Sequence, residues 1–232
     1  MFVPMPRLCS SPIMGWLAGL AYVGAMESVQ GCFIVLEGGE NAGKSTQAKY
    51  LAEDLGAVLT CEPGGTSVGE TIRTLCLDSQ DRPVPRAVLM LMLADRAHHV
   101  EQVLRPALQA GRHVICDRYN GSTVAYQGYG DRLGGQAVQH LCDWATQGLE
   151  PDLVLYLAVP PQTAQQRHRA KLMDQIEQLG GGFHDRVSQG FEAQAASRSN
   201  WVTIDGTGTP EQVHSRCLEA VRARLSALAA DA

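Results

Sequence analysis

The sequence predicts an α/β fold of three layers, a five-stranded parallel sheet with helices on both faces. Short apolar runs alternate along the chain with longer segments whose apolar residues recur every three or four positions. The apolar runs show little polar alternation, which is typical of parallel strands buried on both faces. Regular strand and helix alternation favours right-handed crossovers and places a ligand at the carboxyl ends of the strands.

The elements follow one another in a regular order. Strands are expected where the sequence reads "CFIVL", "VLT", "HVIC", "LVLYL" and "WVTI", at 32–36, 58–60, 113–116, 153–157 and 201–204. Helices are expected from the three- and four-residue spacing at 45–55, 69–77, 86–110, 134–146, 163–172 and 211–229. The glycines of "LGGGF", at 179–183, suggest a mobile loop.

Composition limits the classes of function. A chain of 232 residues with 45% hydrophobic content can bury the core of one domain. The formal net charge of −5, with no block of Lys or Arg, argues against a nucleic-acid partner. Seven cysteines without a CxxC pair indicate free thiols in a reducing cytosol, so a cytoplasmic location is expected. The histidines show no spacing typical of a transition-metal site.

The first residues read as an extension. An apolar stretch at 13–25 follows Arg7 and is too short to span a bilayer. We expect a dispensable extension at 1–29, with Met26 as an alternative start, and one domain at 30–232, without a membrane partner. A targeting segment is the alternative interpretation.

A phosphate-binding loop follows the first strand. The stretch "GGENAGKS", at 38–45, fits the pattern G-x-x-x-x-G-K-S/T between a strand and a helix. Its backbone N–H groups would cradle a β-phosphate, Lys44 would bridge the β- and γ-phosphates, and Ser45 would bind Mg²⁺. The predicted ATP-binding residues are Gly38, Gly39, Glu40, Asn41, Ala42, Gly43, Lys44, Ser45 and Thr46. GTPases, ATPase motors and small-molecule kinases share this loop, so the loop predicts only a nucleoside triphosphate.

Asp117 is the second candidate ligand of Mg²⁺. It follows the strand at 113–116, where a carboxylate could hold a water of the metal opposite Ser45. A helix cap is the alternative role.

The motifs together resemble those of bacterial thymidylate kinases, in the superfamily of P-loop nucleoside monophosphate kinases. "FIVLEGGENAGKSTQ", "TCEPGGTSVGETIR", "MLADRAHHV", "DRYNGSTVAYQGYG", "PDLVLYLAVPP" and "DQIEQLGGGFHDRV" occur in the order and spacing of that family, over residues 31–225. The resemblance implies transfer of the γ-phosphoryl group of ATP to dTMP, with Mg²⁺ and no covalent intermediate. It also implies cytoplasmic dTTP synthesis and a homodimer.

The resemblance also assigns an acceptor site for dTMP. Glu40 would accept a hydrogen bond from the 3′-hydroxyl of the sugar; without the resemblance it reads as a solvated loop charge. Arg73 and Arg96 would clamp the acceptor phosphate, and Arg118 would lie between donor and acceptor. Without it, the three arginines read as surface residues. Glu62 corresponds to a carboxylate near the metal and the acceptor, and the remaining acceptor-side residues are Met92, Ser122, Thr123, Tyr126 and Gln127.

Three positions depart from the family pattern. Cys61 replaces an arginine, Met92 replaces an aromatic residue that stacks on thymine, and Gln175 replaces an arginine in a lid at about 165–184. The lid charge would come from Arg167, Arg169 or Lys171, of which the first two are the catalytic candidates beside Lys44 and Arg118. A solvated basic helix face is the alternative role for these lid residues.

Two other functions stay open. One is a kinase of the same fold that phosphorylates another nucleoside monophosphate, which Met92 and Cys61 make conceivable. The other is a homologue that binds nucleotide without catalysis, against which the intact Lys44, Ser45 and Asp117 argue.

Overall fold

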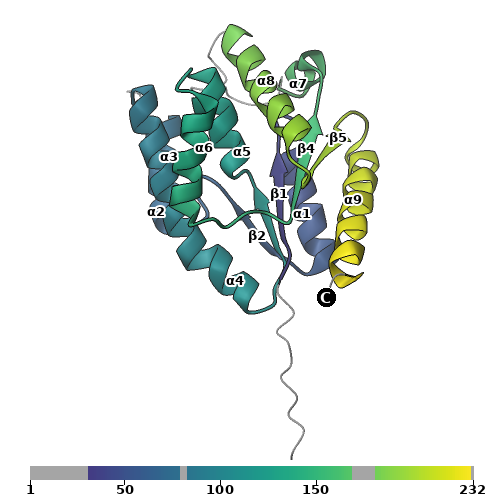
Figure 1. Ribbon diagram of the computed structural model, residues 1–232. Coiled ribbons are helices and arrows are strands. Elements are labelled where there is room, and N and C mark those ends of the chain that lie inside the picture. The colour runs from purple at the N-terminus through teal and green to yellow at the C-terminus, as the bar shows by residue number, and fades with distance from the viewer. Residues whose placement is uncertain (1–30, 79–82, 169–180, 231–232) are drawn as a thin grey trace, which may run out of the picture.

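The computed structural model describes residues 31–78, 83–168 and 181–230 of the chain. The predicted extension at 1–29 and the central part of the predicted lid lie outside these ranges. Figure 1 shows a twisted sheet in the middle of the domain, with helices packed on each side of it.

The sheet confirms the predicted fold class. Its strands are all parallel and lie in the order β2-β3-β1-β4-β5. Their bounds are β1 Phe33–Glu37, β2 Val58–Cys61, β3 Val114–Asp117, β4 Leu153–Ala158 and β5 Trp201–Asp205. Each strand ends one residue later than predicted. The last residues of β1, β2 and β3 are therefore held by the sheet at its carboxyl edge, where Glu37 pairs with Tyr156 and Cys61 pairs with Asp117.

The predicted helices are present with small changes. Their bounds are α1 Lys44–Leu55, α2 Ser67–Arg73, α3 Pro85–His99, α4 Arg105–Gln109, α6 Gly135–Thr146, α7 Pro161–His168 and α9 Pro210–Ala230. Two π-helical turns, η1 Thr74–Asp78 and η2 Val100–Leu104, extend α2 and join α3 to α4. The single helix predicted at 86–110 thus contains a wider turn just before Pro106, which can donate no helical hydrogen bond.

Two further helical regions were not predicted. One is α5 Asn120–Thr123 with its π-helical continuation η3 Val124–Gly130, and the other is α8 Gly181–Ser197. The prediction of a loop at 179–183 is wrong for the last three residues, which form the first turn of α8. The first two residues lie outside the described ranges. Both regions are rich in glycine, a poor helix former, so their helices depend on tertiary packing rather than on propensity.

Strand β1 is the centre of the core. Phe33 and Val35 point to one face and Ile34 and Leu36 to the other, and each has an exposed fraction of 1% or less. Helices α1 and α9 cover the second face, while η2, α4, η3 and α8 cover the first. Burial on both faces explains why this strand reads as an unbroken apolar run. Within the described ranges, no helix has the length and apolarity needed to cross a bilayer.

The packing of α8 on η3 generates a stability prediction. A Cβ atom on Gly190 would lie 2.9 Å from the Cα atom of Ala125 and 3.0 Å from the Tyr129 ring. Gly190→Ala should therefore lower the free energy of unfolding by about 1 to 3 kcal/mol, despite the better helix propensity of alanine.

Gly182 in the same helix provides the control. A Cβ atom there would meet only the Arg186 side chain, at 3.7 Å. Urea unfolding should give Gly182→Ala a stability equal to or above that of the wild type. Equal stabilities of the two variants would contradict this account of the α8 contact.

Candidate active site

The phosphate-binding loop connects β1 to α1 and adopts backbone angles that suit glycine. Gly38 and Gly43 have φ angles of 146° and 98°, and Asn41 has a φ of 57°. A Cβ atom on Gly38 would lie 2.8 Å from the backbone oxygen of Leu157 on β4. The loop thus leads directly into the first turn of α1, where free N–H groups and the helix dipole favour an anion.

Lys44 lies folded against this loop. Its Nζ atom donates a 2.7 Å hydrogen bond to the backbone oxygen of Gly39, and its exposed fraction is 6%. Burial and the neighbouring Arg118 lower the pKa of Lys44 to about 8, although Glu40 acts in the opposite direction. A phosphate on the loop would add negative charge beside this buried ammonium group and favour its charged form.

Ser45 and Asp117 form an oxygen-only pair that fits Mg²⁺. The Ser45 hydroxyl donates a 2.5 Å hydrogen bond to Oδ2 of Asp117, whereas Oδ1 of Asp117 is buried without a hydrogen-bond partner. A hydroxyl, a carboxylate and substrate phosphates are ligands that Mg²⁺ prefers. Within the described part of the chain, no group of three or more His, Cys, Asp or Glu residues could hold a metal ion. A cation held by Ser45 and Asp117 would take its further ligands from water or from substrate phosphates.

Arg118 projects from the end of β3 toward the loop. Its φ of 73° lies in the left-handed region, which costs a non-glycine residue about 1 to 3 kcal/mol. Its Nη2 atom donates a 2.5 Å hydrogen bond to Oε1 of Glu40, and its Nη1 atom donates to the hydroxyl of Ser122 at 3.0 Å. Nη1 also reaches the backbone oxygen of Gly38 at 3.2 Å. The guanidinium group is thus fixed from both the loop and α5.

Glu40 is shared by the loop and the neighbouring pocket. Burial alone would raise its pKa, but the charges of Arg118 and Lys44 lower the pKa to about 2. Tyr126 also donates to Oε1 of Glu40, at 2.7 Å, and its ring lies 5.2 Å from the Arg118 guanidinium. Among the described residues, both side-chain donors to Glu40 use Oε1, which leaves Oε2 for a ligand hydroxyl.

Glu62 holds two other residues of the site in place, Arg96 and His99. Its Oε2 accepts a 2.7 Å hydrogen bond from Nε of Arg96, and its Oε1 lies 2.7 Å from Nδ1 of His99. Arg96 also donates to Thr123, and the other His99 nitrogen contacts the Thr60 hydroxyl. Because both oxygens of Glu62 are engaged, the geometry gives its predicted metal role less support than those of Ser45 and Asp117.

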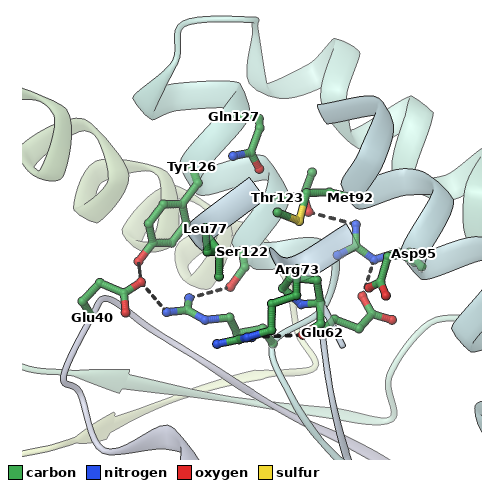
Figure 2. A pocket seen from close by; sticks show the side chains of 13 residues that line it. Glu40, Glu62, Arg73, Leu77, Met92, Asp95, Ser122, Thr123, Tyr126 and Gln127 are labelled. Carbon is green, nitrogen blue, oxygen red and sulfur yellow. Dashed lines mark hydrogen bonds and ion pairs between the residues drawn. The ribbon is translucent and has the colours of Figure 1, made fainter. Parts of the chain in front are cut away.

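The predicted acceptor-side residues all line one pocket (Figure 2). These residues are Glu40, Glu62, Arg73, Met92, Arg96, Arg118, Ser122, Thr123, Tyr126 and Gln127. Pro63, Leu77 and Asp95 complete the lining. Burial and the charge of Glu62 raise the pKa of Asp95 to about 6. The pocket therefore has guanidinium groups for a phosphate and apolar side chains for a base.

Arg167 is the lid candidate that the structure places at the loop. It lies in the last turn of α7, and its Nη1 atom donates to the backbone oxygen of Ala42 at 3.1 Å. Its Nη2 atom donates to the backbone oxygen of Gly206 at 2.7 Å. Arg169, Lys171 and Gln175 lie outside the described residues.

Two buried residues of the site were not singled out from the sequence. Glu37, the last residue of β1, accepts hydrogen bonds from the start of α5, and burial raises its pKa. His99 is completely buried and holds Glu62. The sequence does contain a signal for Glu37, because a charged residue directly follows the apolar run at 32–36. His99 lies one helical turn after Arg96, which is the corresponding signal on α3.

Comparison with known proteins agrees with this geometry. The family model "Thymidylate kinase" matches residues 36–217. Thymidylate kinase from Synechococcus sp. (strain RCC307) is 44% identical over 206 residues, which cover 84% of this chain and 97% of the relative. Thymidylate kinase from Desulfovibrio desulfuricans is 42% identical over 208 residues, which cover 83% and 96% of the two chains. On this evidence, the chain belongs to the thymidylate kinase family.

Proposed function

We propose that this chain transfers the γ-phosphoryl group of ATP to the phosphate of dTMP, which gives ADP and dTDP. One observation carries the proposal: Glu40 and Arg118 belong both to the phosphate-binding loop region and to the pocket that contains the acceptor-side residues. A donor on the loop and an acceptor in this pocket would therefore meet at Arg118.

The donor would be bound at the start of α1. The backbone N–H groups of the loop and Lys44 would hold the phosphates of ATP. Ser45 and Asp117 would hold Mg²⁺, which neutralises charge on the β- and γ-phosphates when it is bound. Arg167, bound to the backbone oxygens of Ala42 and Gly206, would close the same end of the site.

The acceptor would be bound by the pocket beside the loop. Arg73 and Arg96 offer planar guanidinium groups for the 5′-phosphate, and Arg96 is held in place by Glu62. Oε2 of Glu40 would accept a hydrogen bond from the 3′-hydroxyl group. The Tyr126 ring would crowd the 2′ position, and Met92 would cover the base.

The transfer itself needs alignment and charge stabilisation more than proton chemistry. The attacking oxygen of the acceptor phosphate is already anionic, so no general base is required. Arg118 would stabilise the charge that spreads over the transferring group. Its position is set before substrate arrives by hydrogen bonds to Glu40 and Ser122.

We also propose that two copies of the chain associate through α2 and α3. Four exposed large apolar residues lie on this packed pair of helices and on the segments next to them: Val68, Leu75, Val84 and Met90. Burial against a second copy would remove such side chains from water.

The acceptor is tested by a coupled assay of ADP release. With ATP and Mg²⁺, turnover should be fastest with dTMP, and dUMP should follow it within about two orders of magnitude, because one methyl group is worth about 1 to 3 kcal/mol. UMP and CMP should be poor acceptors because Tyr126 crowds the 2′-hydroxyl. Faster turnover of UMP or CMP would identify a different acceptor, and no turnover of any acceptor would favour a homologue that only binds nucleotide.

Met92 allows a prediction about the base. Its exposed fraction is 8%, and it lines the pocket without an aromatic face. Because stacking on an aromatic ring contributes about 1 to 3 kcal/mol per base, Met92→Phe should tighten dTMP binding several-fold, as measured by titration calorimetry. The turnover number should change little, since the base is remote from the transferring group.

Val202→Phe is the control, because Val202 lies on β5, outside the pocket and outside the proposed contact between copies, with an exposed fraction of 36%. It should leave dTMP affinity unchanged. Loss of dTMP phosphorylation in Met92→Phe, with turnover of another nucleotide intact, would show that the pocket serves a different base.

The association of two copies is tested by light scattering. The wild type should have twice the mass of the 25.0 kDa chain, and Met90→Asp should shift the mass toward that of one chain. A monomeric wild type would overturn the proposal.

A further inference from the structure

Glu37 ends β1 immediately before the phosphate-binding loop, and its carboxylate is buried, with an exposed fraction of 1%. Its Oε1 atom accepts hydrogen bonds from the backbone N–H groups of Tyr119 and Ser122, both at 3.0 Å. Its Oε2 atom accepts from the Ser122 hydroxyl at 2.6 Å. The role assigned to the phosphate-binding loop does not account for this carboxylate.

The neighbouring glycine shows that the approach is close. A Cβ atom on Gly121 would lie 2.8 Å from Oε1 of Glu37. The beginning of α5 can therefore lie directly on the carboxylate only because residue 121 has no side chain. Both N–H groups that Glu37 binds lie at the start of this helix, and that of Ser122 is shared with the backbone oxygen of Tyr119 at 3.2 Å.

The direction of the Ser122 hydrogen bond follows from these contacts. A carboxylate can only accept, so the hydroxyl hydrogen of Ser122 points to Glu37. The lone pairs of the same oxygen then face Arg118, whose Nη1 atom donates to it at 3.0 Å. Ser122 thus connects Glu37 to the guanidinium group without placing a second carboxylate on that group.

We propose that Glu37 is a positioning residue for phosphoryl transfer, which holds Arg118 in its working orientation through Ser122 and through the start of α5. The backbone of Arg118 is in the left-handed region, so it needs support from its surroundings to stay there. Glu37 supplies that support on the Tyr119 side, and Glu40 binds the guanidinium on the loop side. This inference rests on the proposed function, because it assigns Arg118 to the transfer.

Glu37→Gln tests the proposal with little change in shape. The amide oxygen of glutamine can still accept from the two backbone N–H groups. Its amide nitrogen, however, would donate to Ser122 and turn the hydroxyl hydrogen toward Arg118, which also donates. The turnover number for dTMP should fall about tenfold or more, with KM for ATP nearly unchanged, since a hydrogen bond to a charged group is lost. Glu101→Gln, on the exposed side of η2, should leave both parameters unchanged.

A double-mutant cycle separates positioning from a general structural role. Arg118→Ala should lower the turnover number about a hundredfold to a thousandfold. In that background, Glu37→Gln should cause little further loss, because the group that it positions is gone. An equal fold-loss in both backgrounds, or an unchanged turnover number for Glu37→Gln alone, would overturn the proposal.

Ser122→Ala provides a second route if Glu37→Gln does not fold. It removes only the hydroxyl that connects Glu37 to Arg118, and its effect on the turnover number should also disappear in the Arg118→Ala background. Additive losses would refute the connection. A wild-type chain that fails to phosphorylate dTMP would instead reject the proposed function, so the two failures are distinguishable.

Discussion

The ion pair between Glu40 and Arg118 is the interaction on which the rest of the site depends. It joins the phosphate-binding loop to the end of β3, and both of its residues line the pocket beside the loop. A carboxylate in a loop that binds phosphate is unexpected by charge alone. Its neighbours explain it, because the charges of Arg118 and Lys44 keep Glu40 ionised. The charge of Glu40 in turn favours the charged forms of these two cations.

The buried polar groups around this pair form connected networks. Glu37 accepts three hydrogen bonds from Tyr119 and Ser122, next to Arg118. Glu62, which lines the same pocket as Arg118, engages Arg96 and His99. Removing one member of such a network leaves a buried charge without its partner, which is costly, so each network fixes a single arrangement of its arginine. The arginines are therefore oriented before substrate binds, which is the form of electrostatic catalysis that phosphoryl transfer requires.

The strands of the sheet and the phosphate-binding loop could be predicted from the sequence alone. Strands buried on both faces leave unbroken apolar runs, and the glycines and Lys44 of the loop follow a pattern set by phosphate geometry. The residues of the acceptor pocket came from the family resemblance, because nothing local marks Arg73 or Thr123 as pocket residues. Helices α5 and α8 were missed because they contain glycines, which favour helices poorly, and some of these serve close contacts, such as Gly190 with Ala125 and Gly121 with Glu37. The network of Glu37 depends on contacts between residues about 80 positions apart, which no local pattern encodes.

We propose that Glu40 has two partners during the reaction: it holds Arg118 through one oxygen and the acceptor sugar through the other. The most direct measurement compares the steady-state kinetics of the wild type and Glu40→Gln with dTMP and with its 3′-deoxy analogue. Glu40→Gln should lower the turnover number with both acceptors, because Arg118 loses its charged partner. It should raise KM only for dTMP, which has the 3′-hydroxyl group. An equal rise in KM for both acceptors, or an unchanged turnover number, would contradict it.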